Sequence, residues 1–179
     1  FGTKAFYEIT LNKLDIIKNH LKEQQKIVVY TDTDIVFLDD ISPDITKFKN
    51  SNYDIMIQND VPNFDEINKS NLCTGFIFFK PNNNTISFIE KSQQNMKDRI
   101  NNRREGQLAD QKSFNEMLKE DKNIKINTLC LKDYPNGKRY FDNVNTIYKQ
   151  YKPKIVHNNF LKKTDEKIVR FKKNNLWFI

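Results

Sequence analysis

Residues 26–38 have the sequence Lys-Ile-Val-Val-Tyr-Thr-Asp-Thr-Asp-Ile-Val-Phe-Leu. The first six form a β-branched and aromatic run without alternation, which is typical of a strand buried on both faces. The run stops at Asp32-Thr33-Asp34, and a second apolar piece, residues 35–38, follows. A buried strand that ends in two carboxylates is typical of an open α/β sheet, in which ligands bind beyond the carboxyl ends of the strands.

Helix and strand patterns alternate on either side of this stretch. Across 4–24, apolar residues recur at spacings of three and four, which predicts an amphipathic helix. Further strands are predicted at 53–57, 73–79, 124–131 and 154–157, a loop at 58–72, and helices at 84–104, 110–118 and 164–174. Asn83 or Asn84 is expected to cap the helix at 84–104. The alternation predicts an α/β sandwich with a mainly parallel sheet.

Length and composition exclude several classes of protein. The 179 residues suit one domain, and 12% aromatic content is too high for a disordered chain. No apolar run approaches the roughly 18 residues of a membrane span. The four glycines lack the spacing of dinucleotide-binding and P-loop motifs. Two cysteines, Cys73 and Cys130, exclude a disulfide framework, and their apolar neighbours predict that both are core residues.

Charge is unevenly distributed along the chain. Residues 119–179 hold 15 basic and 6 acidic residues, a balance of +9, and residues 1–118 hold 15 basic and 17 acidic residues, a balance of −2. This asymmetry suits a site where a metal sits on carboxylates beside an anionic ligand. A solvated basic face is the alternative interpretation.

Asp32 and Asp34 are the strongest candidates for metal ligands. Two carboxylates separated by one residue can both turn toward a hard cation where a strand breaks, and Mg²⁺ or Mn²⁺ keeps positions open for phosphate oxygens. Aspartates in turns also cap or solvate the chain. Four acidic residues within nine positions, at 32, 34, 39 and 40, favour the metal site.

Two other functions fit parts of the sequence. Asp32, Asp34 and Val36 match haloacid-dehalogenase-like phosphatases, but those enzymes carry the motif on their first strand and need a later acidic pair. Here a long predicted helix precedes the motif, and no acidic pair follows an apolar strand after residue 40. A basic nucleic-acid-binding protein is suggested by Arg99, Arg103, Arg104 and the C-terminal lysines. No aromatic-interleaved basic motif supports it, so we expect no nucleic-acid partner.

A series of recognisable segments follows in order along most of the chain: Phe1-Gly2-Thr3, Lys13-Leu14, residues 28–38 with the Asp-x-Asp motif, residues 73–76, Asp110-Gln111 with Phe114-Asn115, residues 156–159, residues 170–172 and residues 176–178. This series resembles the nucleotide-diphospho-sugar transferase family of GT-A glycosyltransferases, and more distantly the glycogenin-like transferases. The combination is more specific than any one motif. The sequence departs from the family at Cys73, where Asn is usual, and at residues 162–164, where a Gly is common.

The resemblance implies a fold and an activity. It implies one GT-A catalytic domain over residues 1–179, with a mixed, mainly parallel sheet flanked by helices and a first nucleotide-binding strand before Phe1. It implies a metal-dependent, retaining glycosyltransferase that uses Mn²⁺ or Mg²⁺. The donor would be a nucleoside-diphosphate sugar, and the acceptor a glycan, glycoprotein or small molecule. No transmembrane segment is expected in this chain, and a cytoplasmic or Golgi lumenal location depends on what precedes Phe1.

The resemblance also implies metal and donor ligands. Asp34 would bind the metal directly, Asp32 would bind metal, ribose or both, and His157 would be the third ligand. Lys13 would contact the donor, and Lys163, six residues after His157, its phosphates. An ordinary core histidine and exposed lysines are the alternatives.

Four further residues are expected around the donor sugar. Thr74 would donate through its hydroxyl, and Gly75 would let the backbone approach the sugar. Asp110 and Gln111 would lie at its anomeric side, where Asp110 is a transient nucleophile or the Gln111 carbonyl steadies an oxocarbenium-like centre. Asp110 also fits a helix N-cap, which is compatible with that place.

Overall fold

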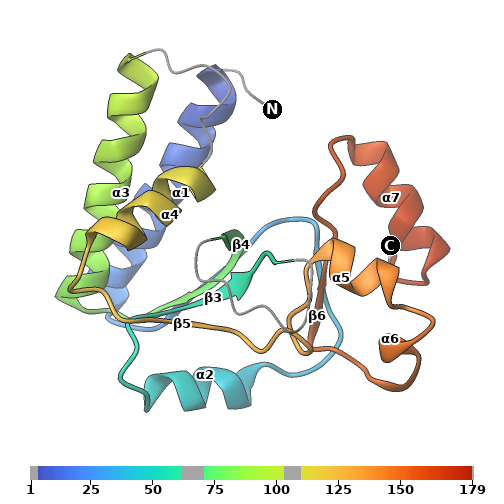
Figure 1. Cartoon of the computed structure of the whole chain (residues 1–179). Helices are drawn as coiled ribbons and strands as arrows, with labels where there is room; N and C mark the ends of the chain where they lie inside the picture. Colours follow the sequence, from blue (N-terminus) through green and yellow to red (C-terminus); the bar gives the residue numbers. More distant parts are fainter. Residues whose placement is uncertain (1–3, 62–70, 103–109, 179) are drawn as a thin grey trace.

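The computed structural model describes residues 4–61, 71–102 and 110–178, with seven helices and six strands among them (Figure 1). In order, they are α1 (Lys4–Gln24), β1 (Val28–Thr31), β2 (Ile35–Phe37), α2 (Ser42–Lys49), β3 (Ile55–Asn59), β4 (Leu72–Phe79), α3 (Asn83–Asn101), α4 (Asp110–Glu120), β5 (Ile126–Thr128), α5 (Gly137–Asp142), α6 (Ile147–Gln150), β6 (Ile155–His157) and α7 (Thr164–Lys173). Phe1-Gly2-Thr3, part of the family resemblance, lies outside the described residues.

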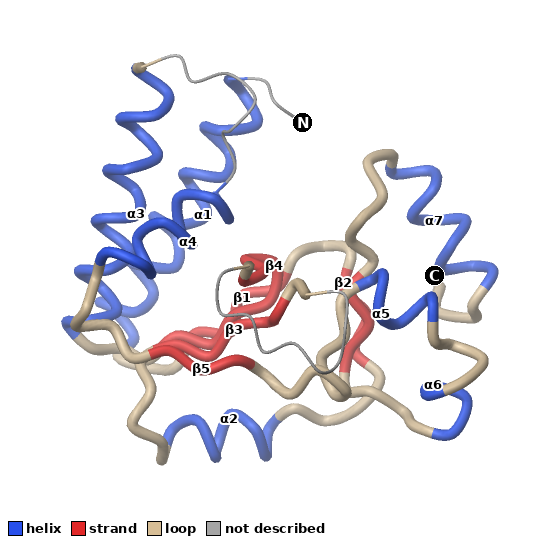
Figure 2. The backbone as a smooth tube through the Cα atoms, viewed as in Figure 1, coloured by secondary structure: helices blue, strands red, loops and turns tan. Residues whose placement is uncertain are grey.

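The central sheet has four strands in the order β1-β4-β3-β5, drawn in red in Figure 2. The predicted α/β class, with a mixed sheet flanked by helices, is confirmed. One detail is corrected, because among the described strands only the β3–β5 pair is parallel, whereas β1–β4, β3–β4 and β2–β6 are antiparallel. All eight residues of β4 are buried. Its unbroken apolar run therefore indicated burial on both faces, which does not fix strand direction.

The two faces of β4 belong to two cores. Ile77 and Phe79 pack in the core under α1, α3 and α4, whereas Phe76 and Phe78 pack in the core that includes Phe48 of α2. Figure 1 shows these helix groups on opposite sides of the sheet. Burial of these large side chains is the main stabilising contribution, at about 1.5–3 kcal/mol each.

A smaller sheet of β2 and β6 lies beside the central one, next to α5, α6 and α7 (Figure 1). Val156 of β6 packs in a third core with Phe171 and Leu176 from the C-terminal segment. The chain crosses from the central sheet to the smaller sheet at residues 32–34, between β1 and β2. The Asp-x-Asp turn is therefore the junction of the two sheets.

Several expected elements differ in the structure. Helix α2 is not among the predicted elements. Pro43, which follows the apolar piece at 35–38, lies in the first turn of this helix, where Pro is favoured. The short helices α5 and α6 were also missed. The strand expected at 124–131 is confined to Ile126–Thr128. Asn82, rather than Asn83 or Asn84, caps α3 by accepting from the Thr85 backbone.

Two other expectations concern burial and the membrane. Cys73 is buried as predicted, but Cys130 is exposed, so only the first is a core residue. Among the helices that the structure describes, none combines the length and the apolar character that a membrane crossing requires.

Candidate active site

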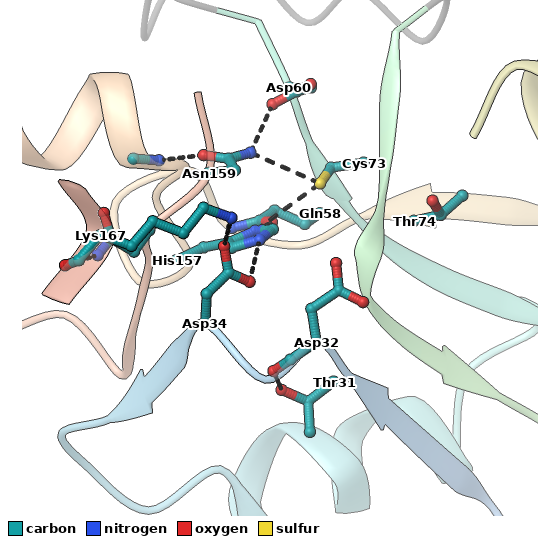
Figure 3. A network of polar contacts seen from close by, with 12 residues as sticks. Thr31, Asp32, Asp34, Gln58, Asp60, Cys73, Thr74, His157, Asn159 and Lys167 are labelled. Atoms are coloured by element: carbon teal, nitrogen blue, oxygen red, sulfur yellow. Dashed lines mark hydrogen bonds and ion pairs between the residues drawn. The ribbon is translucent and has the colours of Figure 1, made fainter. Parts of the chain in front are cut away.

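Backbone pairing places the two aspartates of the Asp-x-Asp turn on different sheets. The Asp32 amide donates to the Gly75 carbonyl of β4 at 2.8 Å, which continues the β1–β4 ladder. The Asp34 carbonyl accepts from the Asn158 amide at 2.8 Å, beside the pairing of Ile35 with His157 in β2 and β6. The turn is fixed at both ends, and its two carboxylates face the gap between the sheets (Figure 3).

Asp32, Asp34 and His157 form a group of three possible metal ligands. Each offers one ligand atom, and these atoms lie within 4.8 Å of one another. Nε2 of His157 lies 3.3 Å from Oδ1 of Asp34, and the His157 side chain is 2% exposed. The structure thus brings together residues more than a hundred positions apart, in the grouping that the resemblance implied.

Gln58 sets the orientation of the His157 ring. The Gln58 amide nitrogen donates to the carbonyls of Tyr134 and Pro135, at 3.2 and 2.9 Å. Its oxygen therefore faces Nδ1 of His157, 2.7 Å away, and accepts a hydrogen bond from the Nδ1–H group. With a cation in the site, a neutral imidazole held in this way would direct the lone pair of Nε2 at the cation, as a metal-binding histidine does.

Gly75 keeps open the space between Asp32 and His157. A Cβ on this glycine would lie 2.4 Å from Cε1 and 3.0 Å from Nε2 of His157, and 2.8 Å from Oδ2 of Asp32. No side chain fits there without displacing one of the two candidate ligands. A carboxylate, an imidazole nitrogen and a space next to both, with Asp34 close by, fit a divalent cation, because carboxylate oxygens suit Mn²⁺ and Mg²⁺ and an imidazole nitrogen suits transition metals.

A β-bulge brings Gly75 to this place. Ile57 of β3 pairs with Ile77 of β4, so a regular antiparallel ladder would pair Gln58 with Phe76; instead Gln58 pairs with Cys73. Residues 74–76 of β4 therefore have no pairing partner on β3, and they approach β1 and the Asp-x-Asp turn. The same shift points Gln58 at His157. Bulges next to functional sites commonly redirect side chains in this way.

Asp34 is an ionised residue in a partly buried place. Burial acts to raise the pKa of its carboxyl, but contacts with His157 and Lys167 outweigh burial and hold the pKa well below its usual value. Nζ of Lys167 donates to Oδ2 of Asp34 at 2.6 Å. The carboxylate is therefore charged at neutral pH, which a metal ligand must be.

Lys13, Thr74 and Asp110 form a second polar group on the other wall of the site. Nζ of Lys13 donates to Oδ2 of Asp110 at 2.6 Å and to the Thr74 carbonyl at 2.9 Å, and it lies 4.1 Å from the centre of the Tyr30 ring. The Thr74 hydroxyl also donates to Asp110, at 3.0 Å. Lys13 fixes Asp110 at the start of α4 in this structure, and its contact with a donor stays a prediction.

Gln111 belongs to a third group, which includes a carboxylate that we did not predict. Its amide nitrogen donates to Oδ2 of Asp60 at 3.2 Å, and Asn159 donates to Oδ1 of Asp60 at 3.2 Å. Burial raises the pKa of Asp60 above its usual value, against the opposing effects of Gln111, His157, Asn159 and Arg139. Asp60 was missed because its segment was assigned to a loop.

The position of Lys163 differs from that of Lys167. Lys163 is the exposed residue before α7, and it is not among the residues that line the cleft described below. Lys167, one turn along the helix, lines the cleft and reaches Asp34. The predicted phosphate contact of Lys163 is untested, and Lys167 is the better-placed cation among the described residues of α7.

These groups surround one cleft of about 1040 Å³. Its polar lining comes from α1, the Asp-x-Asp turn, β4 and α4, and includes Lys13, Asp32, Asp34, Thr74, Gly75, Asp110 and Gln111. Its apolar lining lies mainly near α7 and includes Phe160, Leu161, Ile168, Phe171 and Trp177. The cleft is large enough for a sugar nucleotide and part of a second substrate.

Among the basic residues that suggested nucleic-acid binding, the C-terminal lysines Lys162, Lys163, Lys172 and Lys173 are exposed, whereas Arg99 is not. Arg99 is 7% exposed and pairs with Glu116. Arg103 and Arg104 lie outside the described residues.

Comparison with known proteins identifies the family of this chain. A family model described as nucleotide-diphospho-sugar transferase matches residues 1–171. A UDP-galactose:fucoside alpha-3-galactosyltransferase of Dictyostelium discoideum is 30% identical, over 100% of this chain and 29% of the relative. UDP-D-xylose:L-fucose alpha-1,3-D-xylosyltransferase MGP4 of Arabidopsis thaliana is 27% identical, over 100% of this chain and 52% of the relative. The chain thus spans between about a third and half of the length of these relatives. With the match covering nearly its whole length, the chain belongs to the nucleotide-diphospho-sugar transferase family.

Proposed function

We propose that this chain carries the donor site of a metal-dependent, retaining glycosyltransferase that moves a sugar from a UDP-sugar to an acceptor containing L-fucose. One observation supports the proposal most strongly: Gly75 leaves a space between Asp32 and His157 that a single methyl group would fill. The two relatives, named for galactose or xylose transfer to fucose, support the substrate classes.

Asp32, Asp34 and His157 are the residues that would hold the cation. When bound, Mn²⁺ or Mg²⁺ supplies a Lewis acid for the diphosphate leaving group. The chain itself contributes ligand orientation, because Gln58 fixes the tautomer of His157 and backbone pairing fixes both aspartates. Lys167 adds a positive charge next to Asp34, where the departing diphosphate gains negative charge.

Asp110 and Gln111 would have different roles at the donor sugar. Lys13 and Thr74 both donate hydrogen bonds to Asp110, and these bonds make its carboxylate a weaker nucleophile. Asp110 is therefore better suited to accept a hydrogen bond from a sugar hydroxyl. Gln111 donates through its nitrogen to Asp60, so its carbonyl oxygen is directed away from that carboxylate. In this scheme the oxygen faces the anomeric carbon and steadies its developing positive charge while the acceptor enters from the same side.

A donor screen tests the function. Purified chain is incubated with UDP-galactose, UDP-xylose and other nucleotide sugars, with methyl α-L-fucoside as acceptor, and free UDP is measured with Mn²⁺ and with a chelator. We expect metal-dependent UDP release from one donor. Hydrolysis of p-nitrophenyl phosphate without use of any nucleotide sugar would instead favour the phosphatase alternative.

A further inference from the structure

An exposed aromatic side chain lies on the cleft next to the candidate metal ligands. Phe160 lines the cleft and is 54% exposed, although most phenylalanines whose burial the structure describes are buried. It follows His157 by three residues, so its Cα lies within about 11 Å of that of His157 on chain length alone. The acceptor hydroxyl must reach the donor sugar within this region if the proposed function is right.

The backbone of Phe160 has an unfavourable conformation. Its φ angle is 64°, in the left-handed region that large side chains seldom adopt. Such strain persists only where the surroundings impose it, and it is found preferentially at functional sites. No gain in burial explains it here, because the side chain remains more than half exposed.

The two residues before Phe160 are held in place from three directions. Arg170 donates through Nε to Oδ1 of Asn158, at 2.5 Å, and through Nη2 to the Asn159 carbonyl, at 2.6 Å. The Asn159 side chain accepts from the Gly137 amide at 2.6 Å and donates to Asp60 at 3.2 Å. These contacts fix the segment between β6 and α7, and they hold the Phe160 ring at the cleft.

The neighbours of Phe160 decide what its ring can bind. Leu161, Ile168 and Trp177 line the same cleft. The side chains assigned to the donor sugar belong to β4 and α4, whereas Lys167, assigned to its diphosphate, belongs to α7. Figure 1 shows α4 and α7 on opposite sides of the ends of the strands. A pyranose ring has one face of C–H groups, which gains by covering an apolar ring. L-fucose also has a methyl group where most hexoses carry a hydroxymethyl group.

We propose that Phe160 is the platform of the acceptor site, on which the apolar face of an L-fucosyl ring stacks with its attacking hydroxyl toward the donor. The proposal rests on the proposed function, and it adds the place of the acceptor to it. The strained backbone follows from this role, because it presents the ring to the substrate rather than to a core.

Two substitutions test the platform with methyl α-L-fucoside as the probe. In Phe160→Asn, the ring is lost but the residue tolerates the left-handed conformation. We expect the acceptor KM to rise by about ten-fold and the donor KM to stay within about two-fold. The thermal midpoint of the ligand-free chain should stay equal or rise. Phe160→Tyr keeps the ring and should keep the parent's acceptor KM.

Phe178 offers a matched control. It is 71% exposed and is not among the residues that line the cleft, so Phe178→Asn removes a ring that is even more exposed and should leave both KM values unchanged. Saturation-transfer NMR with methyl α-L-fucoside gives a second readout that does not need turnover. The fucoside signal should be strong in the parent and in Phe178→Asn, and weak in Phe160→Asn.

The results separate this inference from the proposed function. An unchanged acceptor KM in Phe160→Asn overturns the platform, as does an equal rise of the donor KM, which would place the ring against the donor. A lower thermal midpoint with an unchanged acceptor KM would make Phe160 a structural residue. A parent that releases UDP from a donor but does not use or bind the fucoside overturns only the acceptor site. A parent that binds no nucleotide sugar overturns both.

Discussion

Substitution of Gly75 by Ala is the most direct test of the metal position. The new methyl group would lie 2.4 Å from Cε1 and 3.0 Å from Nε2 of His157, and 2.8 Å from Oδ2 of Asp32. Contacts below 3.0 Å do not occur between real atoms of this kind, so something must move. The His157 ring cannot move easily, because it is 2% exposed and hydrogen-bonded to Gln58. Asp32 is 39% exposed and can turn away.

Two losses follow from this crowding. Overpacking of a fixed site costs about 1–3 kcal/mol of unfolding free energy. In a chain of this size, each kcal/mol lowers the melting temperature by roughly 2–4 °C. Displacement of one ligand should weaken Mn²⁺ binding by about 10- to 100-fold, the range found when groups that orient metal ligands are lost. Calorimetric titration of Mn²⁺ in the presence of UDP measures the affinity, and thermal unfolding of the metal-free chain measures the stability.

Gly137→Ala separates metal binding from stability. A Cβ at Gly137 would lie 2.6 and 2.8 Å from the backbone carbonyl oxygens of Asn159 and His157. The overlap is similar in size to that at Gly75, but it involves backbone atoms rather than the candidate ligand side chains. We expect a comparable loss of stability and a smaller loss of Mn²⁺ affinity. If Gly75→Ala binds Mn²⁺ as tightly as the parent, the cation does not lie between Asp32 and His157, and the reasoning from the Gly75 space is wrong.

Three further predictions concern the same site. Asp34→Asn should abolish metal-dependent turnover and lower the unfolding free energy of the metal-free chain at neutral pH by about 1.5–3 kcal/mol. Because the pKa of Asp34 is lowered in the folded chain, this stabilisation is present above the usual Asp pKa of 3.8 and is lost as the pH falls below it. Equal metal dependence in Asp34→Asn and parent would contradict the ligand assignment. Lys167→Met should strengthen Mn²⁺ binding in the absence of nucleotide by about 1 kcal/mol, roughly five-fold, because the Lys167 ammonium group no longer competes for Asp34. The same substitution should weaken the binding of UDP in the presence of Mn²⁺. Weaker metal binding without nucleotide would show that Lys167 only orders the site. The anomeric proton of the product, read by NMR, should show an α linkage from an α-linked donor, and a β product would remove the role given to Gln111.

Much of the fold was predictable because it depends on local patterns. The amphipathic spacing across 4–24 and the apolar run of β4 each correspond to an observed element. The errors arose where one signal has two meanings. Pro43 ends an apolar piece and also begins α2. The apolar run of β4 shows burial on both faces, and its antiparallel partners became visible only in the assembled sheet.

The family resemblance identified candidate ligands, but it did not identify the groups that orient them. Asp32, Asp34 and His157 occupy recognisable motif positions. Gln58 and Asp60 lie at the end of β3 and just after it, within the stretch 58–72 that was predicted as a loop. Lys167 was missed for another reason. The spacing of six residues from His157 pointed to Lys163, whose phosphate contact stays a prediction, and no sequence signal distinguished Lys167, which lines the cleft from within α7.

The β-bulge explains why such residues escape detection from sequence. A bulge of three residues in an otherwise apolar strand changes no hydrophobic pattern, because residues 74–76 are buried whether or not they pair with β3. Its consequences lie entirely in space: Gln58 turns to His157, and Gly75 moves against the Asp-x-Asp turn. Gly75 is the one local trace of this arrangement, since a glycine inside a buried strand indicates a bulge or a close approach. The residue that least resembles a ligand therefore carries the most information about where the proposed cation would bind, and for this reason Gly75→Ala is a sharper test than removal of any one candidate ligand.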